Sequence, residues 1–126
     1  LGNYAGLSDS LTTILEGIVG RAPAEMSVEY HHGVPLTVPN RNAVDAAADV
    51  ARQSDLTIAC IGLSPLLEGE EGDAVLAAAG GDRIELDPPE AQLAYLQRLH
   101  AAGARLVLVV CAGSPVNLSA VEALAE

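Results

Sequence analysis

The chain has few aromatic and few basic side chains. It contains no Trp or Phe and only three Tyr, and six Lys and Arg stand against 17 Asp and Glu, so the formal net charge is −11 at pH 7. Nucleic acids and anionic membrane surfaces attract Lys and Arg through their phosphate groups. The charge therefore argues against nucleic acid and against a membrane surface as partners.

Long apolar runs and targeting signals are also missing from the sequence. No apolar run approaches the ~20 residues of a membrane-spanning helix. The first residues show no basic region followed by an apolar run, so we expect no signal peptide. The chain begins at Leu1 without Met and stops at Glu126 within a helical pattern, so we expect it to be a piece of a longer protein.

Cysteine and histidine are too sparse to indicate a metal site. Cys60 and Cys111 each lie near the end of an apolar run, where cysteine behaves as a small apolar residue, so we expect buried free thiols. His31 and His32 are adjacent, and adjacent side chains of an extended segment point to opposite sides. With no second cluster at ligand spacing, we expect no metal and no cofactor.

The order of the expected elements predicts a doubly wound α/β domain. Periodicity and capping residues predict three helices. The first covers 10–19 and is capped by the side chains of 8–10, and the second covers about ten residues after the cap Asn42. The third runs from Pro89 to Gly103. Strands are expected at 27–30, 56–63 and 106–111. The last two are nearly unbroken apolar sequence, which is typical of parallel strands covered on both faces. Alternating helices and strands imply a parallel sheet with right-handed crossovers.

An acidic loop follows the strand expected at 56–63. Glu68, Glu70, Glu71 and Asp73 fall within six residues, in a long connection that runs from 64 to 88. Ligands usually bind at the carboxyl ends of strands in open α/β sheets. Like charges packed together raise the pKa of at least one carboxyl group, which can then act as a general acid near neutral pH. The alternative is a solvated acidic loop in an acidic protein.

Two neighbouring motifs have structural interpretations. Ser114 follows a strand but lies in no Gly-x-Ser-x-Gly elbow, so we interpret it as the start of a helix before Pro115. Asp82 and Arg83 either form a plain surface ion pair, or bring an arginine to the acidic loop, where it would lower the pKa of the carboxylate it meets.

Several blocks of sequence together resemble one known family. They are the run from Ile61 to Glu71, the run from Gly81 to Leu86, Pro89 with Gln92, and the run from Cys111 to Val116. In this order they are similar to the C-terminal α/β-sandwich domain of glycoside hydrolase family 3, which contains β-glucosidases and β-xylosidases. Residues 1–6, with 12–18 behind them, look most like the β-xylosidase branch.

The resemblance implies a three-layer α/β/α sandwich with a mostly parallel sheet, part of an (α/β)6 sandwich, with residues 1–126 as a single truncated domain. It implies a retaining hydrolase of β-linked oligosaccharides or glycosides, whose nucleophilic Asp lies on a preceding (β/α)8 barrel outside this chain. That barrel would be the partner. It would supply most of the substrate binding, because sugars favour flat aromatic surfaces and this chain has few.

The resemblance also assigns roles to residues of the acidic loop. It makes Glu70 the general acid/base, with Glu68 and Glu71 as alternatives, because a shift of one or two residues changes which side chain points inward. Asp82 and Arg83 match the family's Asp-Arg pair and are expected to contact the substrate, although several residues here separate them from the glutamates. Without the barrel, the chain alone is expected to be inactive.

Two other functions remain open from the residues themselves. One is a non-catalytic α/β module in which loop 64–88 packs against a neighbour or binds a sugar. The other is a small-molecule-binding or receiver-type domain with an acidic pocket of its own.

Overall fold

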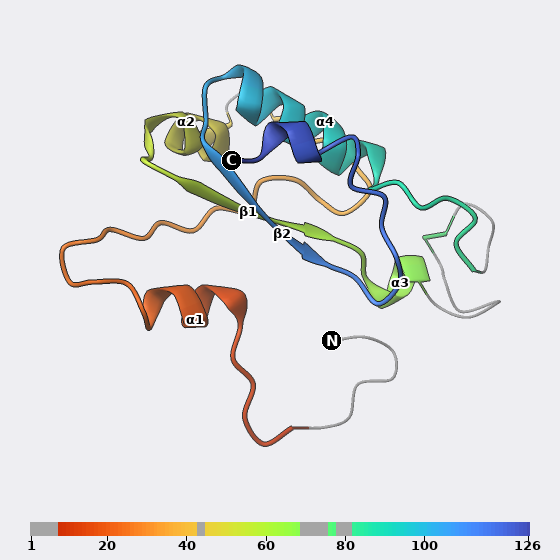
Figure 1. Cartoon of the computed structure of the whole chain (residues 1–126), viewed down its shortest axis with the longest axis horizontal. Coiled ribbons are helices and arrows are strands. Elements are labelled where there is room, and N and C mark those ends of the chain that lie inside the picture. The colour runs from red at the N-terminus through yellow and green to blue at the C-terminus, as the bar shows by residue number, and fades with distance from the viewer. Residues whose placement is uncertain (1–7, 43–44, 69–75, 78–81) are drawn as a thin grey trace.

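A computed structural model of the chain describes residues 8–42, 45–68, 76–77 and 82–126. The elements in chain order are α1 (Ile14–Val19), α2 (Ala46–Gln53), β1 (Thr57–Gly62), α3 (Pro65–Glu68), α4 (Glu90–Ala101), β2 (Leu106–Cys111) and the 3₁₀ turn η1 (Glu122–Leu124). Together they form a mixed α/β fold around a small parallel sheet (Figure 1).

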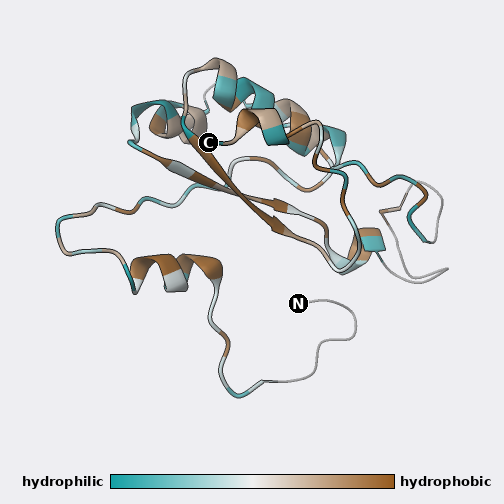
Figure 2. Ribbon diagram, viewed as in Figure 1, coloured by the Kyte–Doolittle hydropathy of each residue, from teal (hydrophilic) through white to brown (hydrophobic). Residues whose placement is uncertain are grey.

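The sheet consists of β1 and β2, the two strands whose apolar sequence predicted them. They pair in parallel from Thr57 opposite Leu106 to Gly62 opposite Cys111. β2 is hydrophobic along its whole length, and β1 is hydrophobic over much of its length (Figure 2). The crossover between them contains α4, as expected for parallel neighbours. The predicted strands at 56–63 and 106–111 and their parallel pairing are confirmed.

One face of this sheet carries the hydrophobic core. Helices α2 and α4 and the turn η1 lie together on this side of the strands (Figure 1). The most deeply buried side chains are Leu96 of α4, Leu106 of β2 and Val121 before η1, with exposed fractions of 1%, 0% and 1%. Asp45 joins the two helices: it caps α2, accepts a 3.2 Å hydrogen bond from the Tyr95 hydroxyl, and pairs with Arg98 of α4.

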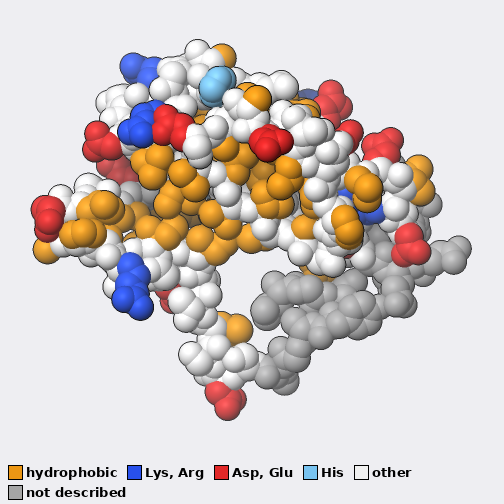
Figure 3. All heavy atoms as spheres, viewed as in Figure 1, with side chains coloured by type: hydrophobic (Ala, Val, Ile, Leu, Met, Phe, Trp, Pro, Cys, Tyr) orange, Lys and Arg blue, Asp and Glu red, His pale blue; other side chains and the backbone are white. Residues whose placement is uncertain are grey.

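The opposite face of the sheet is apolar as well, and it is open to solvent. Ile58 keeps 39% of its surface exposed, and Cys60 and Cys111 are both free and exposed. The prediction of buried thiols is therefore wrong. Side chains alternate along a strand, and these three belong to the face away from α2 and α4. Hydrophobic side chains gather over the middle of the molecule, below the helices (Figure 3).

Helix α1 lies apart from the sheet, on the side away from α2 and α4 (Figure 1). None of its residues is buried. It begins later than the sequence indicated, because Thr13 and Glu16 form a capping box, with the Glu16 amide donating to the Thr13 hydroxyl at 3.1 Å. The predicted start at residue 10, with caps from residues 8–10, is wrong. The Ser8 hydroxyl instead donates to the Ser10 carbonyl and accepts a hydrogen bond from the Ser10 amide.

Two further expectations for the first half of the chain are corrected. Residues 27–30 form no strand: a strand needs a hydrogen-bonded neighbour, and in the described part of the chain the sheet consists of β1 and β2 without this segment. The next helix starts at Ala46, and its cap is Asp45 in place of Asn42, because the Asp45 carboxylate accepts a hydrogen bond from the Ala48 amide at 3.2 Å. Asn42 instead donates its own amide to Asn40.

The limits predicted for α4 are close to those observed. Pro89 occupies the N-cap, one residue before the position expected for it. Gly103 ends the helix with a φ of 88°, a left-handed conformation that favours glycine. The expected apolar stripe is present, with Leu96 and Leu99 buried and Leu93 packed against the core.

Gln92 is the buried polar residue that fixes the end of β1, and its removal should destabilise the fold. It is 3% exposed, accepts from the Gly62 amide at 2.9 Å, and donates to the Gly62 carbonyl at 2.8 Å and the Leu36 carbonyl at 3.1 Å. Gln92→Leu leaves these backbone groups without their partner, so we expect the free energy of unfolding to fall by about 2–4 kcal/mol in urea denaturation.

The matched control for this variant is Gln97→Leu, because Gln97 is exposed on the same helix. It should change the free energy of unfolding by less than about 0.5 kcal/mol. Equal effects of the two substitutions would contradict the role given to Gln92.

Candidate functional site

The loops after β1 and β2 lie at the same edge of the sheet, because the strands are parallel and in register. Leu63 and Ser64 lead from β1 into α3, whose last residue is Glu68. Gly113 and Ser114 follow β2. The carboxyl ends of parallel strands are where ligands usually bind in such sheets.

The carboxylate of Glu68 joins these two loops. Its Oε2 accepts a hydrogen bond from the Gly113 amide at 2.9 Å, and its Oε1 accepts one from the Ser114 amide at 2.9 Å. The Ser114 hydroxyl also donates to Oε1. The Glu68 side chain is only 13% exposed. Both oxygens are therefore engaged in a largely enclosed position.

Arg83 joins the same cluster. It follows residues 69–82, called the acidic segment below, whereas Glu68 precedes them. Its Nη1 lies 3.7 Å from Glu68 Oε1 and donates to the Ser114 hydroxyl oxygen at 3.1 Å. Longer contacts of 3.5 Å join it to the carbonyls of Pro115 and Asp87. The Arg83 side chain is 12% exposed, whereas Asp82 is exposed. Of the two interpretations of this pair, the one that brings an arginine to a carboxylate of the loop is confirmed.

These contacts set the charge of Glu68. Desolvation raises the pKa of its carboxyl group, but hydrogen bonds from the Ser114 side chain and from the Gly113 and Ser114 amides lower it, as does the charge of Arg83. The net effect is a pKa below the usual value, so Glu68 is ionised at neutral pH. Glu70, Glu71 and Asp73 lie outside the described residues, and the raised pKa expected in this loop stays a prediction.

The helix start expected at Ser114 is wrong. The chain around it is irregular, and its amide and hydroxyl both bind Glu68. Sequence reasoning therefore missed the main polar contact of Ser114. The available signal was the run Gly113-Ser114-Pro115 directly after a buried strand, a turn sequence whose amides can face an anion.

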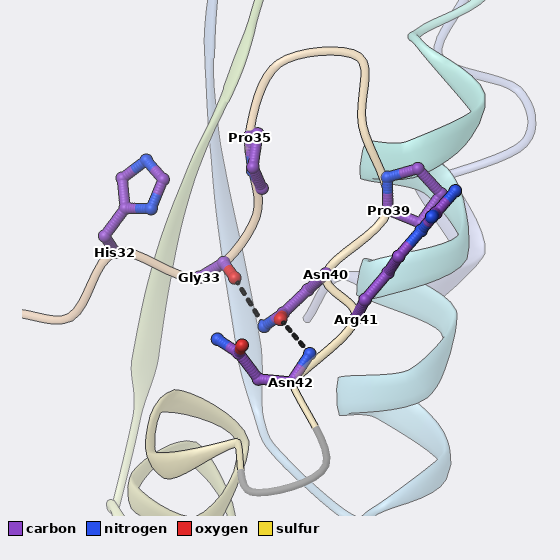
Figure 4. A pocket seen from close by; sticks show the side chains of 7 residues that line it. All are labelled: His32, Gly33, Pro35, Pro39, Asn40, Arg41 and Asn42. Carbon is purple, nitrogen blue, oxygen red and sulfur yellow. Dashed lines mark hydrogen bonds between the residues drawn. The ribbon is translucent and has the colours of Figure 1, made fainter.

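Described residues line two hollows of similar size. One, of about 210 Å³, is at the strand ends and is lined mostly by apolar side chains and by Gln92. The other, of about 220 Å³, lies in the loop between His32 and Asn42 (Figure 4). There the Asn40 side chain donates to the Gly33 carbonyl at 3.0 Å and accepts from the Asn42 amide at 3.0 Å, which closes the loop on itself.

Within 8–42, 45–68, 76–77 and 82–126, no group of three His, Cys, Asp or Glu side chains comes together as metal ligands would. His31 instead lies 3.6 Å from Glu29. In the same ranges, no helix is both long enough and apolar enough to cross a membrane.

The sequence of residues 1–125 matches the family model of the glycosyl hydrolase family 3 C-terminal domain. The chain belongs to this family. The family resemblance inferred from the blocks around Glu68, Arg83, Gln92 and Ser114 is therefore confirmed, and these blocks include the residues that meet at the strand ends.

Similar proteins include several β-xylosidases. A "Beta-xylosidase" of Formosa agariphila is 24% identical over 119 residues, which cover 94% of this chain and 15% of that protein. The "Probable beta-D-xylosidase 7" of Arabidopsis thaliana is 31% identical over 119 residues, covering 94% of this chain and 14% of that protein. A "Xylan 1,4-beta-xylosidase" of Xylanibacter ruminicola is 40% identical over 62 residues, which cover 48% of this chain and 7% of that protein. This family 3 C-terminal domain thus spans about a seventh or less of the length of these relatives.

Proposed function

We propose that this domain is part of a retaining β-glycosidase of the β-xylosidase type and supplies the general acid/base of a site shared with a (β/α)8 barrel domain. The observation that carries the proposal is the match to the glycosyl hydrolase family 3 C-terminal domain over residues 1–125. The relatives named above as β-xylosidases support the choice of a β-linked xyloside as substrate.

In this proposal Glu70 is the group that carries the proton. A retaining mechanism needs one protonated carboxyl group for the leaving oxygen and one ionised carboxylate for attack, roughly 5–5.5 Å apart. Glu68 is kept ionised by its own donors. The close sequence spacing of Glu70, Glu71 and Asp73 supports a proton held within this group, because each ionised carboxylate makes ionisation of the next harder. Closure against the barrel would desolvate the loop and act in the same direction.

We further propose that the intact protein completes a three-layer α/β/α sandwich around this sheet. A further layer of helices would then cover the open apolar face with Ile58 and Cys60, in the way that α4 covers the other face of the sheet. The nucleophilic Asp and most of the sugar contacts would come from the barrel, and Asp82 and Arg83 would lie beside the substrate site. Arg83 is already held at the strand ends by Ser114.

The test is hydrolysis of aryl β-xylosides by the intact protein, with the first-formed sugar followed by NMR. We expect turnover with retention of the anomeric configuration, and no turnover by residues 1–126 alone, because the nucleophile would be missing. An intact protein that hydrolyses neither xylosides nor glucosides, or a first product of inverted configuration, would contradict the proposal.

A further inference from the structure

We infer that Glu68 is a positioning residue: its carboxylate fastens both ends of the acidic segment to the turn after β2. The inference rests on the proposed function, because its consequence for catalysis concerns the acid/base of that same site. Glu68 lies directly before the acidic segment and Arg83 directly after it, and the structure describes both residues.

The first end of the segment is held by hydrogen bonds across the sheet edge. Glu68 is the last residue of α3, and its two oxygens bind the consecutive amides of Gly113 and Ser114 at 2.9 Å each. Two amides bound by two oxygens of one carboxylate restrict both its position and its rotation. The loops after β1 and β2 are thereby joined at one point.

The second end of the segment returns to the same point. Arg83 donates to the Ser114 hydroxyl oxygen at 3.1 Å and lies 3.7 Å from Glu68. Between the two ends, the Leu76 amide donates to the Leu66 carbonyl of α3 at 2.9 Å. Glu68 and Arg83, which stand 15 positions apart in the sequence, therefore meet in one cluster with Ser114.

The contacts of Glu68 suit an anchor and do not suit an acid. Every described partner of its carboxylate is a donor or a cation, and such partners stabilise the ionised form. The lowered pKa of Glu68 agrees with this. A carboxylate already ionised at neutral pH has no proton to give to a leaving group.

The consequence for catalysis follows from chain geometry. A residue two positions from Glu68 has its Cα within about 7 Å of the Glu68 Cα, whatever the conformation between them. Fixing Glu68 therefore limits where Glu70 can lie. A misplacement of about 1 Å in an active site can lower the rate roughly 10²-fold.

The experiment compares Glu68→Gln, Ser114→Ala and the double variant in the intact enzyme. For Glu68→Gln we expect kcat to fall about 10- to 100-fold on good and poor leaving groups alike, with a smaller change in KM. The basic limb of the pH profile should remain, and azide should restore nothing, because the acid/base is still present. The double variant should be less impaired than the product of the single losses, because both single variants break the same contact.

Glu126→Gln is the matched control, because Glu126 also pairs with an arginine, Arg105, at 2.7 Å, but does so at the start of β2. It should leave kcat unchanged. Amide exchange at Gly113 and Ser114 in the same intact proteins reports the contact without reference to activity, and it should quicken at least tenfold in Glu68→Gln and stay unchanged in Glu126→Gln.

Three results would overturn the inference. One is faster amide exchange in Glu68→Gln with unchanged kcat, and another is exchange that does not change at all. The third is azide rescue of Glu68→Gln with loss of the basic limb, which would make Glu68 the acid itself and leave the proposed glycosidase function standing. That function fails separately, if the wild-type protein hydrolyses no β-glycoside.

Discussion

Glu70→Gly in the intact enzyme is expected to lower turnover of xylosides with poor leaving groups about 10²- to 10⁴-fold, the usual contribution of a general acid. The physical reason is that an alkoxide or other basic oxygen leaves slowly without a proton. A substrate with an acidic phenol as leaving group needs little protonation, so its first step should be slowed much less. Comparing kcat for the two substrates separates loss of the acid from loss of the fold.

Azide provides the second measurement on the same variant. A small anion can occupy the space left by the carboxylate and attack the glycosyl-enzyme without a general base, so it should restore turnover and yield a glycosyl azide. Glu71→Gly is the matched control from the adjacent position, and it should show neither effect. If Glu71→Gly shows the rescue and Glu70→Gly does not, the acid/base is Glu71 and the assignment to Glu70 is wrong.

Gly62→Ala is expected to lower the free energy of unfolding by at least about 4 kcal/mol, among the largest effects of a single substitution. Gly62 ends β1 with a φ of 142°, which side chains rarely adopt. An added Cβ would overlap the Cys111 carbonyl oxygen and lie 2.7 Å from its carbon. That carbonyl accepts a 2.8 Å hydrogen bond from the Leu63 amide. The substitution would therefore push the two strands apart at the point where their loops begin.

Gly103→Ala separates backbone strain from this overlap. Gly103 also has a positive φ, 88°, but a Cβ there would meet no atom within 4 Å. We expect a loss of about 1–2 kcal/mol from strain alone. Urea denaturation of both variants measures the difference. Similar losses would show that the close approach of Cys111 contributes little.

The elements that the sequence predicted well are those whose sequence pattern and burial agree. β1, β2 and the apolar stripe of α4 pack together in the core, so the pattern of apolar residues in their sequences was enough to predict them. Residues 27–30 were mispredicted because β-propensity says nothing about whether a partner strand is beside them. Cys60 and Cys111 were mispredicted because an apolar strand shows that burial is favourable, and not which face is covered.

The candidate site was predictable in place but not in its contacts. Parallel pairing of β1 and β2 put the acidic loop and Ser114 at one edge, and this followed from the pattern. The partnership of Glu68 with Ser114 did not, because the donors include backbone amides whose direction depends on the turn after β2. A propensity argument assigned Ser114 to a helix start and so missed a contact between distant parts of the chain.

Glu68 and Arg83 are both held at the single turn after β2, on either side of residues 69–82. When both ends of a segment are held at one point, the number of residues between them hardly affects the rest of the fold, since each doubling of length costs only about 0.6 kcal/mol in closure entropy. Insertions and deletions can then accumulate between 69 and 82 while the anchor stays in place. A change in the number of residues between 69 and 82 would then leave the cluster of Glu68, Arg83 and Ser114 in place.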